Sequence, residues 1–242
     1  MESSETVQHS SNHKEGTLVI MAKAPRAGTV KTRLAHSLPV EAVTELYRCL
    51  LNDTIALAHT LPSVDVAIMC PASDVEELLP IAGPDTPVVA QQGNGLAAGL
   101  TSVFAKFTAA AGKRVIAFNS DSPHLPTSVL ASAFERLKAH DVVVGPTNDG
   151  GYYLVGAKAS HDALFHGDGM GTQSALDALL ARAGNLQLSV GFTDPFYDID
   201  VKGDLSQLAE ELQLAPQRAP QTAAWLKQWR EMERQVPSRG EP

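Results

Sequence analysis

Short apolar runs alternate with helical patterns along most of this chain, and this alternation constrains the fold more than any other feature of the sequence. Three of the runs are TLVIMAK (residues 17–23), RVIAFN (114–119) and DVVVG (141–145). Runs of this length are typical of strands buried on both faces of a parallel sheet. Because parallel strands need crossover connections, the pattern predicts a three-layer α/β/α, Rossmann-like domain with a mostly parallel central sheet.

The remaining elements follow the same rhythm. Further strands are expected over residues 64–69, 87–90, 152–157 and 186–190, and helices over residues 40–59, 74–79, 96–111, 127–140, 172–182, 202–212 and 222–235. At 242 residues the chain is long for an average domain but within the range of single α/β domains. We therefore expect a polar leader over residues 1–16, one domain over residues 17–214, and a C-terminal helix and tail over residues 215–242.

Composition and charge exclude several classes of function. The net charge is -8, from 19 basic and 27 acidic residues, which argues against nucleic acid or an anionic membrane as partner. No apolar run approaches the roughly 20 residues of a membrane helix. The leader lacks the apolar centre of a secretory signal, and the two cysteines, Cys49 and Cys70, give no disulfide framework. These features favour a cytoplasmic protein.

In such an acidic chain, the basic loop after the first strand is informative. Residues 24–33 read APRAGTVKTR, and Lys23 precedes them. In open α/β sheets, ligands bind beyond the carboxyl ends of the strands, where this loop is expected. Gly28 permits close approach of backbone amides, and Lys31 and Arg33 can contact phosphate oxygens. The alternative is a solvated basic loop. Neither a Walker A pattern nor G-x-G-x-x-G is present.

Asp121 follows the strand over residues 114–119 and is expected at the carboxyl edge of the sheet. A carboxylate there, facing a phosphate loop, suits Mg²⁺ or Mn²⁺, which prefer oxygen ligands and bridge to substrate phosphates. The competing interpretation is that Asp121 caps the following helix, with Pro123 in its first turn.

A second acidic group is Asp198 and Asp200, after Pro-Phe-Tyr. Two aspartates two positions apart in an extended segment point to the same side, so both could face one metal ion. A turn, or a helix N-cap before residues 202–212, is the competing interpretation.

Between these groups lies the segment Asn-Asp-Gly-Gly-Tyr, residues 148–152. Its glycines, Gly150 and Gly151, allow positive φ and leave room for a ligand beside the backbone. Asp-Gly is also a strong hairpin signal, so an ordinary turn explains Asp149 and the two glycines equally well.

Taken together, five segments resemble the glycosyltransferase-A-like family of small bacterial transferases, within the nucleotide-diphospho-sugar transferase superfamily. They are AKAPRAGTVKTRL, QQGNGLAAGL, NSDSPHLP, GPTNDGGYYLVG and DIDVKGDL, in that order. The resemblance covers residues 17–212 and extends more distantly to nucleotidyltransferases that make molybdenum-cofactor dinucleotides and phospholactate guanylyl conjugates. Many members carry a tryptophan-serine pair where this chain has HGDGMG (residues 166–171), so the chain departs from the family pattern at a segment expected to contact the acceptor.

The resemblance implies a nucleotide-diphospho-sugar transferase fold with nucleotide phosphates at the first loop and Mg²⁺ or Mn²⁺ at the strand-end aspartate. The catalytic residues it indicates are Lys31 and Asp121. The metal ligands are Asp121, Asp198 and Asp200. The nucleotide site would contain Lys23, Gly28, Lys31, Arg33, Gln92, Gly93, Asp149, Gly150 and Gly151.

Three functions follow from this pattern. The first is metal-dependent glycosyl transfer from a nucleotide-sugar to a small-molecule acceptor. The second is nucleotidyl transfer from a nucleoside triphosphate, of the guanylyl or cytidylyl type, with release of pyrophosphate. The third is a nucleotide-binding module without catalysis. The helix with Trp225 and Trp229 could pack on its own domain or form a homodimer.

Overall fold

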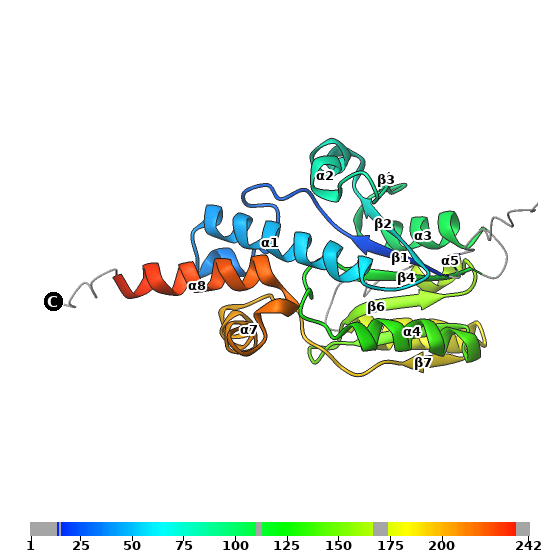
Figure 1. The fold of residues 1–242 in the computed structure, drawn as a ribbon. Coiled ribbons are helices and arrows are strands. Elements are labelled where there is room, and N and C mark those ends of the chain that lie inside the picture. Colours follow the sequence, from blue (N-terminus) through cyan, green and yellow to red (C-terminus); the bar gives the residue numbers. More distant parts are fainter. Residues whose placement is uncertain (1–13, 15, 110–112, 167–173, 236–242) are drawn as a thin grey trace, which may run out of the picture.

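The structure, a computed structural model, describes residue 14 and residues 16–109, 113–166 and 174–235. A seven-stranded sheet of order β3-β2-β1-β4-β6-β5-β7 lies at its centre (Figure 1). The strands are β1 (Gly16–Met21), β2 (Val64–Cys70), β3 (Val88–Ala90), β4 (Arg114–Asn119), β5 (Val142–Pro146), β6 (Tyr152–Ala157) and β7 (Val190–Phe192). This confirms the predicted α/β class.

Six of the strands run in one direction, and β6 runs against them. β1 pairs in parallel with β2 and β4, whereas β6 is antiparallel to both β4 and β5. The Asp-Gly-Gly segment therefore forms the hairpin turn between β5 and β6. Because β6 lies between β4 and β5, the crossover after β4 skips one position in the sheet.

Helices cover both faces of the sheet, as predicted. One face packs against α1 (Val40–His59), α2 (Val75–Ala82) and α4 (Thr127–Ala139). The other packs against α3 (Gly95–Phe107), α5 (Asp162–Phe165) and α6 (Ala175–Asn185). The apolar strands are buried on both sides, since neighbouring residues of β1 such as Leu18 and Val19 face opposite cores.

A third apolar core joins the C-terminal helices to the domain. The outer side of α1 packs against α7 (Lys202–Leu214) and α8 (Pro220–Gln235), with Ile199 buried among them (Figure 1). Trp225 and Trp229 stack with ring centroids 5.4 Å apart and pack against this core. The helix over residues 220–235 therefore packs on its own domain, while the homodimer stays a prediction.

The predicted element bounds agree with the structure to within a few residues, and the helix over residues 40–59 agrees at both ends. The largest shifts are in the last strand, which begins at Val190 instead of residue 186, and in α3, which ends at Phe107 instead of residue 111. Gly16 of the predicted leader already belongs to β1. Most of that leader and the segment 167–173 lie outside the described residues. In the part of the chain that the structure describes, no helix is long and apolar enough to cross a bilayer.

Candidate functional site

The loop after β1 is shaped by two ion-pair clusters rather than by one basic patch. At its start, Thr29 donates a backbone hydrogen bond to the carbonyl of Arg26, which closes a turn with Gly28 at φ +75°. A Cβ at Gly28 would meet no atom within 4 Å, so the backbone angle is what favours glycine there.

Arg26 belongs to the first cluster and is used in folding. Its guanidinium binds Asp74 at 2.8 Å and Glu77 at 2.6 Å, and Asp74 also accepts the backbone N–H of Ala24 at 2.9 Å. Burial raises the pKa of Asp74, but the hydrogen bonds from Ala24, Ser73 and Arg26 outweigh it and hold this pKa below its ordinary value. Arg26 thus fastens the loop to the start of α2.

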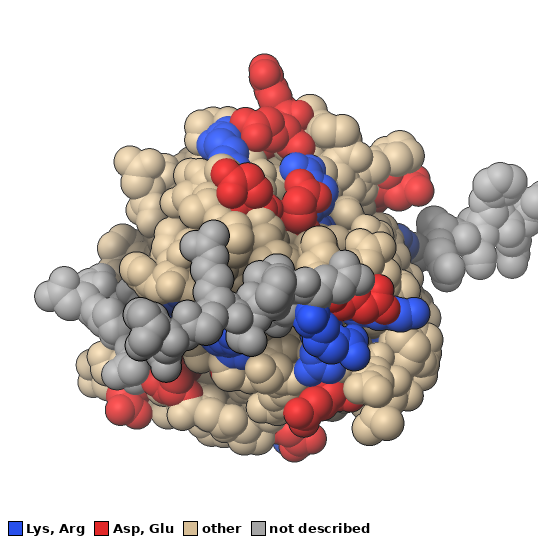
Figure 2. Space-filling view, turned by 90° about the vertical axis from the view of Figure 1, so that its left-hand side faces the viewer, with Lys and Arg blue, Asp and Glu red and all other residues tan. Residues whose placement is uncertain are grey.

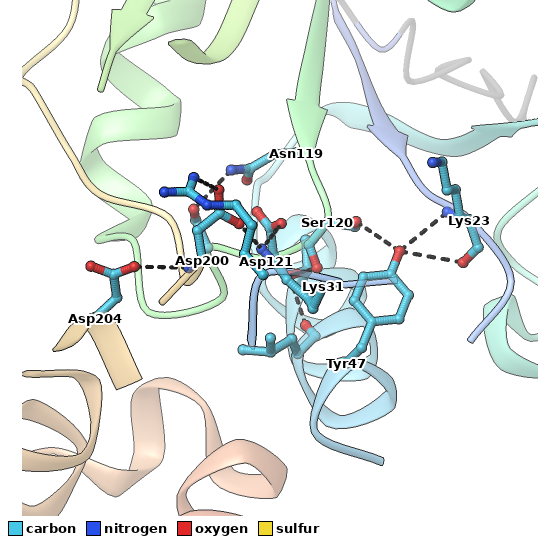
Figure 3. A network of polar contacts seen from close by, with 12 residues as sticks. Lys23, Lys31, Tyr47, Asn119, Ser120, Asp121, Asp200 and Asp204 are labelled. Carbon is cyan, nitrogen blue, oxygen red and sulfur yellow. Dashed lines mark hydrogen bonds and ion pairs between the residues drawn. The ribbon is translucent and has the colours of Figure 1, made fainter. Parts of the chain in front are cut away.

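Lys31 forms the second cluster at the far end of the loop. Its side chain is 5% exposed, and its ammonium contacts Asp121 and lies 3.0 Å from Oδ1 of Asp200 (Figure 3). Arg33 binds the other oxygen of Asp200 at 3.0 Å. Burial lowers the pKa of Lys31, but the charges of Asp121 and Asp200 more than compensate, so its ammonium stays protonated.

Asp121 is brought to this cluster by the end of β4. The predicted alternative, that it caps the next helix, is wrong: α4 begins at Thr127 and Pro126 occupies the N-cap position. The Oδ1 atom of Asp121 is buried and has no hydrogen-bond partner among the described residues. One oxygen therefore faces Lys31 while the other is unsatisfied.

The segment after β7 supplies the remaining carboxylates. Ile199 is fully buried in the third core, which turns its neighbours Asp198 and Asp200 toward Lys31. Burial, and next the charges of Asp121 and Asp200, raise the pKa of Asp198 to about 6. Asp204, rather than Asp198 or Asp200, accepts the backbone N–H groups of Asp200 and Val201 at the start of α7.

Tyr47, which the sequence analysis missed, ties the loop to the acidic cluster. Its hydroxyl accepts the backbone N–H of Lys23 at 3.1 Å and lies 3.0 Å from Oγ of Ser120 (Figure 3). Its position on the inward face of α1 marks it as a core residue in the sequence, and only the fold places its hydroxyl beside Ser120, the residue before Asp121. The side chain of Lys23 is exposed.

A cavity of about 800 Å³ opens beside these groups. Its lining includes Lys23, Lys31, Arg33, Tyr47, Ser120, Asp121 and Asp200, with Gln91, Gly95 and Leu96 on another side. The predicted Gln92 and Gly93 are not among its lining residues. Gln91 does line the cavity, and its side-chain amide donates to the carbonyls of Gly93 (3.0 Å) and Gly95 (3.2 Å). Gly93 therefore helps to position Gln91.

The predicted residues Asp149, Gly150 and Gly151 lie in the β5–β6 turn and do not line this cavity. Asp149 accepts the hydroxyl of Thr147 at 2.5 Å and the backbone N–H of Gly151 at 3.3 Å. A Cβ at Gly151 would lie 2.9 Å from the Thr147 hydroxyl, so a tightly closed turn explains the glycine. Their nucleotide role stays a prediction.

The types of donor suit Mg²⁺ or Mn²⁺, because the charges of Asp121 and Asp200 act on Asp198 and one buried oxygen of Asp121 lacks a partner among the described residues. As the side chains lie, however, no three His, Cys, Asp or Glu side chains of the described residues converge to hold a metal ion. The ammonium of Lys31 lies between Asp121 and Asp200.

His124 lies in the segment between β4 and α4 that also contains Asp121. Its ring is fully buried, packs 4.7 Å from the rings of Phe196 and Tyr197, and has no hydrogen-bond partner on either nitrogen within the described residues. Burial, with a smaller contribution from Arg218, lowers its pKa to about 3, so the ring is neutral. This neutral aromatic contact joins the segment after β4 to the segment after β7.

Figure 2 shows acidic and basic side chains side by side on one face of the molecule.

Comparison with known proteins gives a family match over part of the chain and a fold. Residues 54–172 match the family described as "Uncharacterized protein conserved in bacteria (DUF2064)". A solved structure from Desulfovibrio desulfuricans G20, described as a candidate nucleotide-diphospho-sugar transferase, shares 27% identity and a TM-score of 0.83, covering 92% of this chain and 98% of that one. No curated protein sequence matches the chain.

More distant structures share the fold alone. The 4-diphosphocytidyl-2C-methyl-D-erythritol synthase of Anaerococcus prevotii has 12% identity and a TM-score of 0.55, over 84% of this chain and 97% of that one. A CMP:2-keto-3-deoxy-manno-octonic acid synthetase complexed with CTP has 11% identity and the same TM-score, over 83% and 99%. The resemblance to the nucleotide-diphospho-sugar transferase superfamily that the motifs indicate is confirmed by the similarity to the Desulfovibrio desulfuricans structure.

Proposed function

Since the chain carries the nucleotide-diphospho-sugar transferase fold, we propose that it is a divalent-metal-dependent transferase that takes a nucleotide-sugar as donor and a small molecule as acceptor. The observation that supports this most is the cluster of Lys31, Asp121, Asp198 and Asp200 beside the 800 Å³ cavity. Carboxylates and cations meet there at the carboxyl edge of a parallel sheet, where ligands of such folds bind.

The basic residues of the loop suit the donor phosphates. Lys31 presents a compact charge, Arg33 a planar fork, and Lys23 an exposed ammonium at the cavity wall. In glycosyl transfer the nucleoside diphosphate leaves with negative charge on its terminal phosphate. Lys31 and Arg33 are therefore the groups that stabilise this charge as it develops.

Asp121, Asp198 and Asp200 are the residues that would hold the metal ion. When bound, Mg²⁺ or Mn²⁺ would neutralise negative charge on the donor phosphates. The hydrogen bonds of Tyr47 to Lys23 and Ser120 connect the ends of β1 and β4, so the loop after β1 and Asp121 lie at the same cavity. No protein nucleophile is required in this scheme.

A thermal-shift screen tests the proposal. Purified protein is heated with nucleotide-sugars and with nucleoside triphosphates, each with and without Mg²⁺ or Mn²⁺. A ligand that binds only the folded chain stabilises it, by about 2.7 kcal/mol at a hundred times its Kd, and this raises the midpoint temperature of unfolding. We expect a metal-dependent shift with one nucleotide-sugar.

Two outcomes redirect the proposal. A shift with a triphosphate alone, followed by release of pyrophosphate on adding acceptors, indicates nucleotidyl transfer. Binding of nucleotide that is the same with and without metal indicates a module without catalysis. Asp65→Asn is a matched control for Asp121→Asn. Asp65 lies at the opposite edge of the sheet, at the amino end of β2, and among the described residues it pairs only with Lys14 and Lys113.

A further inference from the structure

Lys31 is unusual because its ammonium is held by the carboxylates that the metal ion needs. It contacts Asp121 and lies 3.0 Å from Asp200, and the charge of Asp198 also acts on it. Only 5% of its side chain is exposed, although it lies in the wall of a large cavity. A buried ammonium is costly unless carboxylates surround it, so these contacts fix its position.

The backbone of Lys31 is consistent with a held side chain. Its φ is +48°, a left-handed conformation that costs a residue with a side chain on the order of 1 kcal/mol. Val30 before it and Leu34 after it are buried in apolar cores, so the backbone on both sides of Lys31 is held in place. Movement of the ammonium out of the cluster is therefore a movement of the side chain, and it breaks the ion pairs with Asp121 and Asp200.

We propose that Lys31 is an internal counter-ion of the acidic cluster, which a divalent metal must displace, and that donor phosphates draw the displaced ammonium into the cavity. This inference rests on the proposed function for the identity of the second ligand. It makes metal and nucleotide binding mutually supportive: the metal frees Lys31 for the phosphates, and the phosphates keep Lys31 away from the carboxylates.

The affinity for metal alone tests the displacement. MnCl₂ is titrated into the full chain by calorimetry, without nucleotide. Lys31→Gln removes the competing charge, so we expect its Kd for Mn²⁺ to fall by about tenfold or more relative to the unmodified protein. Lys31→Arg keeps a competing cation and should not gain affinity to that extent.

Arg33→Gln separates displacement from a general effect of charge. It removes one positive charge that, among the described residues, pairs with Asp200 alone, from a side chain that is 59% exposed. We expect its affinity for Mn²⁺ to rise by no more than about threefold, since solvent screens exposed ion pairs. Equal gains for Lys31→Gln and Arg33→Gln would overturn the proposal.

The position of Lys31 can also be followed directly. Reductive methylation with mass spectrometry measures how readily each lysine reacts, and the exposed Lys23 is the internal reference. Without metal, Lys31 should be protected. With saturating MnCl₂ its labelling should rise several-fold relative to Lys23, and unchanged protection in the presence of bound Mn²⁺ would contradict displacement.

The two proposals fail in different ways. If Lys31→Gln binds Mn²⁺ more tightly while no nucleotide-sugar or triphosphate shifts the midpoint, the counter-ion role stands and the proposed function fails. If a nucleotide binds with metal while Lys31→Gln gains no affinity for Mn²⁺, only the counter-ion role fails.

Discussion

The two ion-pair clusters of the loop after β1 use similar residues and differ in how completely their polar atoms are satisfied. Around Arg26, Asp74 accepts hydrogen bonds from Ala24, Ser73 and Arg26, and its pKa is lowered. Around Lys31, Asp121 leaves a buried oxygen unpartnered and the pKa of Asp198 is raised.

This difference separates a structural cluster from a candidate binding site. A saturated network has nothing further to gain from a ligand, whereas buried carboxylates that lack partners gain from an added cation. Both clusters would look alike in a count of charged residues, so the count of unsatisfied oxygens is the more informative observation.

The strongest test of the comparison is Asp121→Asn. We expect it to lower turnover by about a hundredfold to a thousandfold, because removing one group that stabilises transition-state charge typically costs this much. Steady-state kinetics with the donor found in the screen measures the effect. Since Asp121 is not a helix cap, circular dichroism should remain unchanged, and retained turnover would refute the metal role.

The saturated cluster should respond in the opposite way. Asp74→Ala removes a carboxylate that is 6% exposed and leaves the N–H of Ala24 without its partner. We expect a loss of about 2–3 kcal/mol in the free energy of unfolding, measured in urea. Glu77→Gln, at an exposed pair, should cost less than about 1 kcal/mol. A similar small loss for Asp74→Ala would weaken the assignment of this cluster to folding.

His124 extends the comparison to a neutral buried group. Its pKa of about 3 in the folded chain lies below the ordinary value of 6.5, so the unfolded chain binds the proton first as pH falls. Stability due to neutral His124 is therefore lost from about pH 6.5 downward. When the pH is lowered from 7 to 5, we expect the free energy of unfolding of the unmodified protein to fall by about 1–2 kcal/mol more than that of His124→Phe, as measured in urea at each pH. Parallel losses would show that His124 is solvated.

The smallest effect is expected for Asp198→Asn in metal-free protein. Because its folded pKa of about 6 is raised, Asp198 binds a proton more readily in the folded chain. The stability that this proton provides is lost as pH rises from about 4 through about 6. Asp198→Asn should therefore be more stable by about 1 kcal/mol at pH 7.5, with a smaller gain at pH 5. Its affinity for Mn²⁺ should fall, and a variant without either change would place Asp198 outside the cluster.

Local sequence patterns predicted most of the fold because they follow from local physics. The apolar periodicity of residues 40–59 and the continuous run over 114–119 reproduce α1 and β4 at both ends. Side-chain chemistry also indicated the carboxylates of the candidate site, since Asp121, Asp198 and Asp200 follow strand or extended patterns at the sheet edge. The roles of these residues are still predictions.

Other parts of the site could not be found this way. The sequence favoured Gln92 and Gly93 for the cavity, whereas the turn at Gly93 directs Gln91 toward it. Arg26 and Lys31 looked equivalent in the sequence, because each is a cation in the same short loop. Their difference depends on partners that lie 48 and 169 residues away.

The sequence alone indicated the order and type of most elements, although not the short helix α5 (Asp162–Phe165), and it indicated the kinds of side chain at the strand ends. The tertiary structure decided the place of β6 between β4 and β5, the packing of α8 on α1, and which carboxylates surround Lys31. Hydrophobic periodicity depends on residues that are close together in the sequence, whereas ion pairing and burial depend on which distant segments the folded sheet brings together.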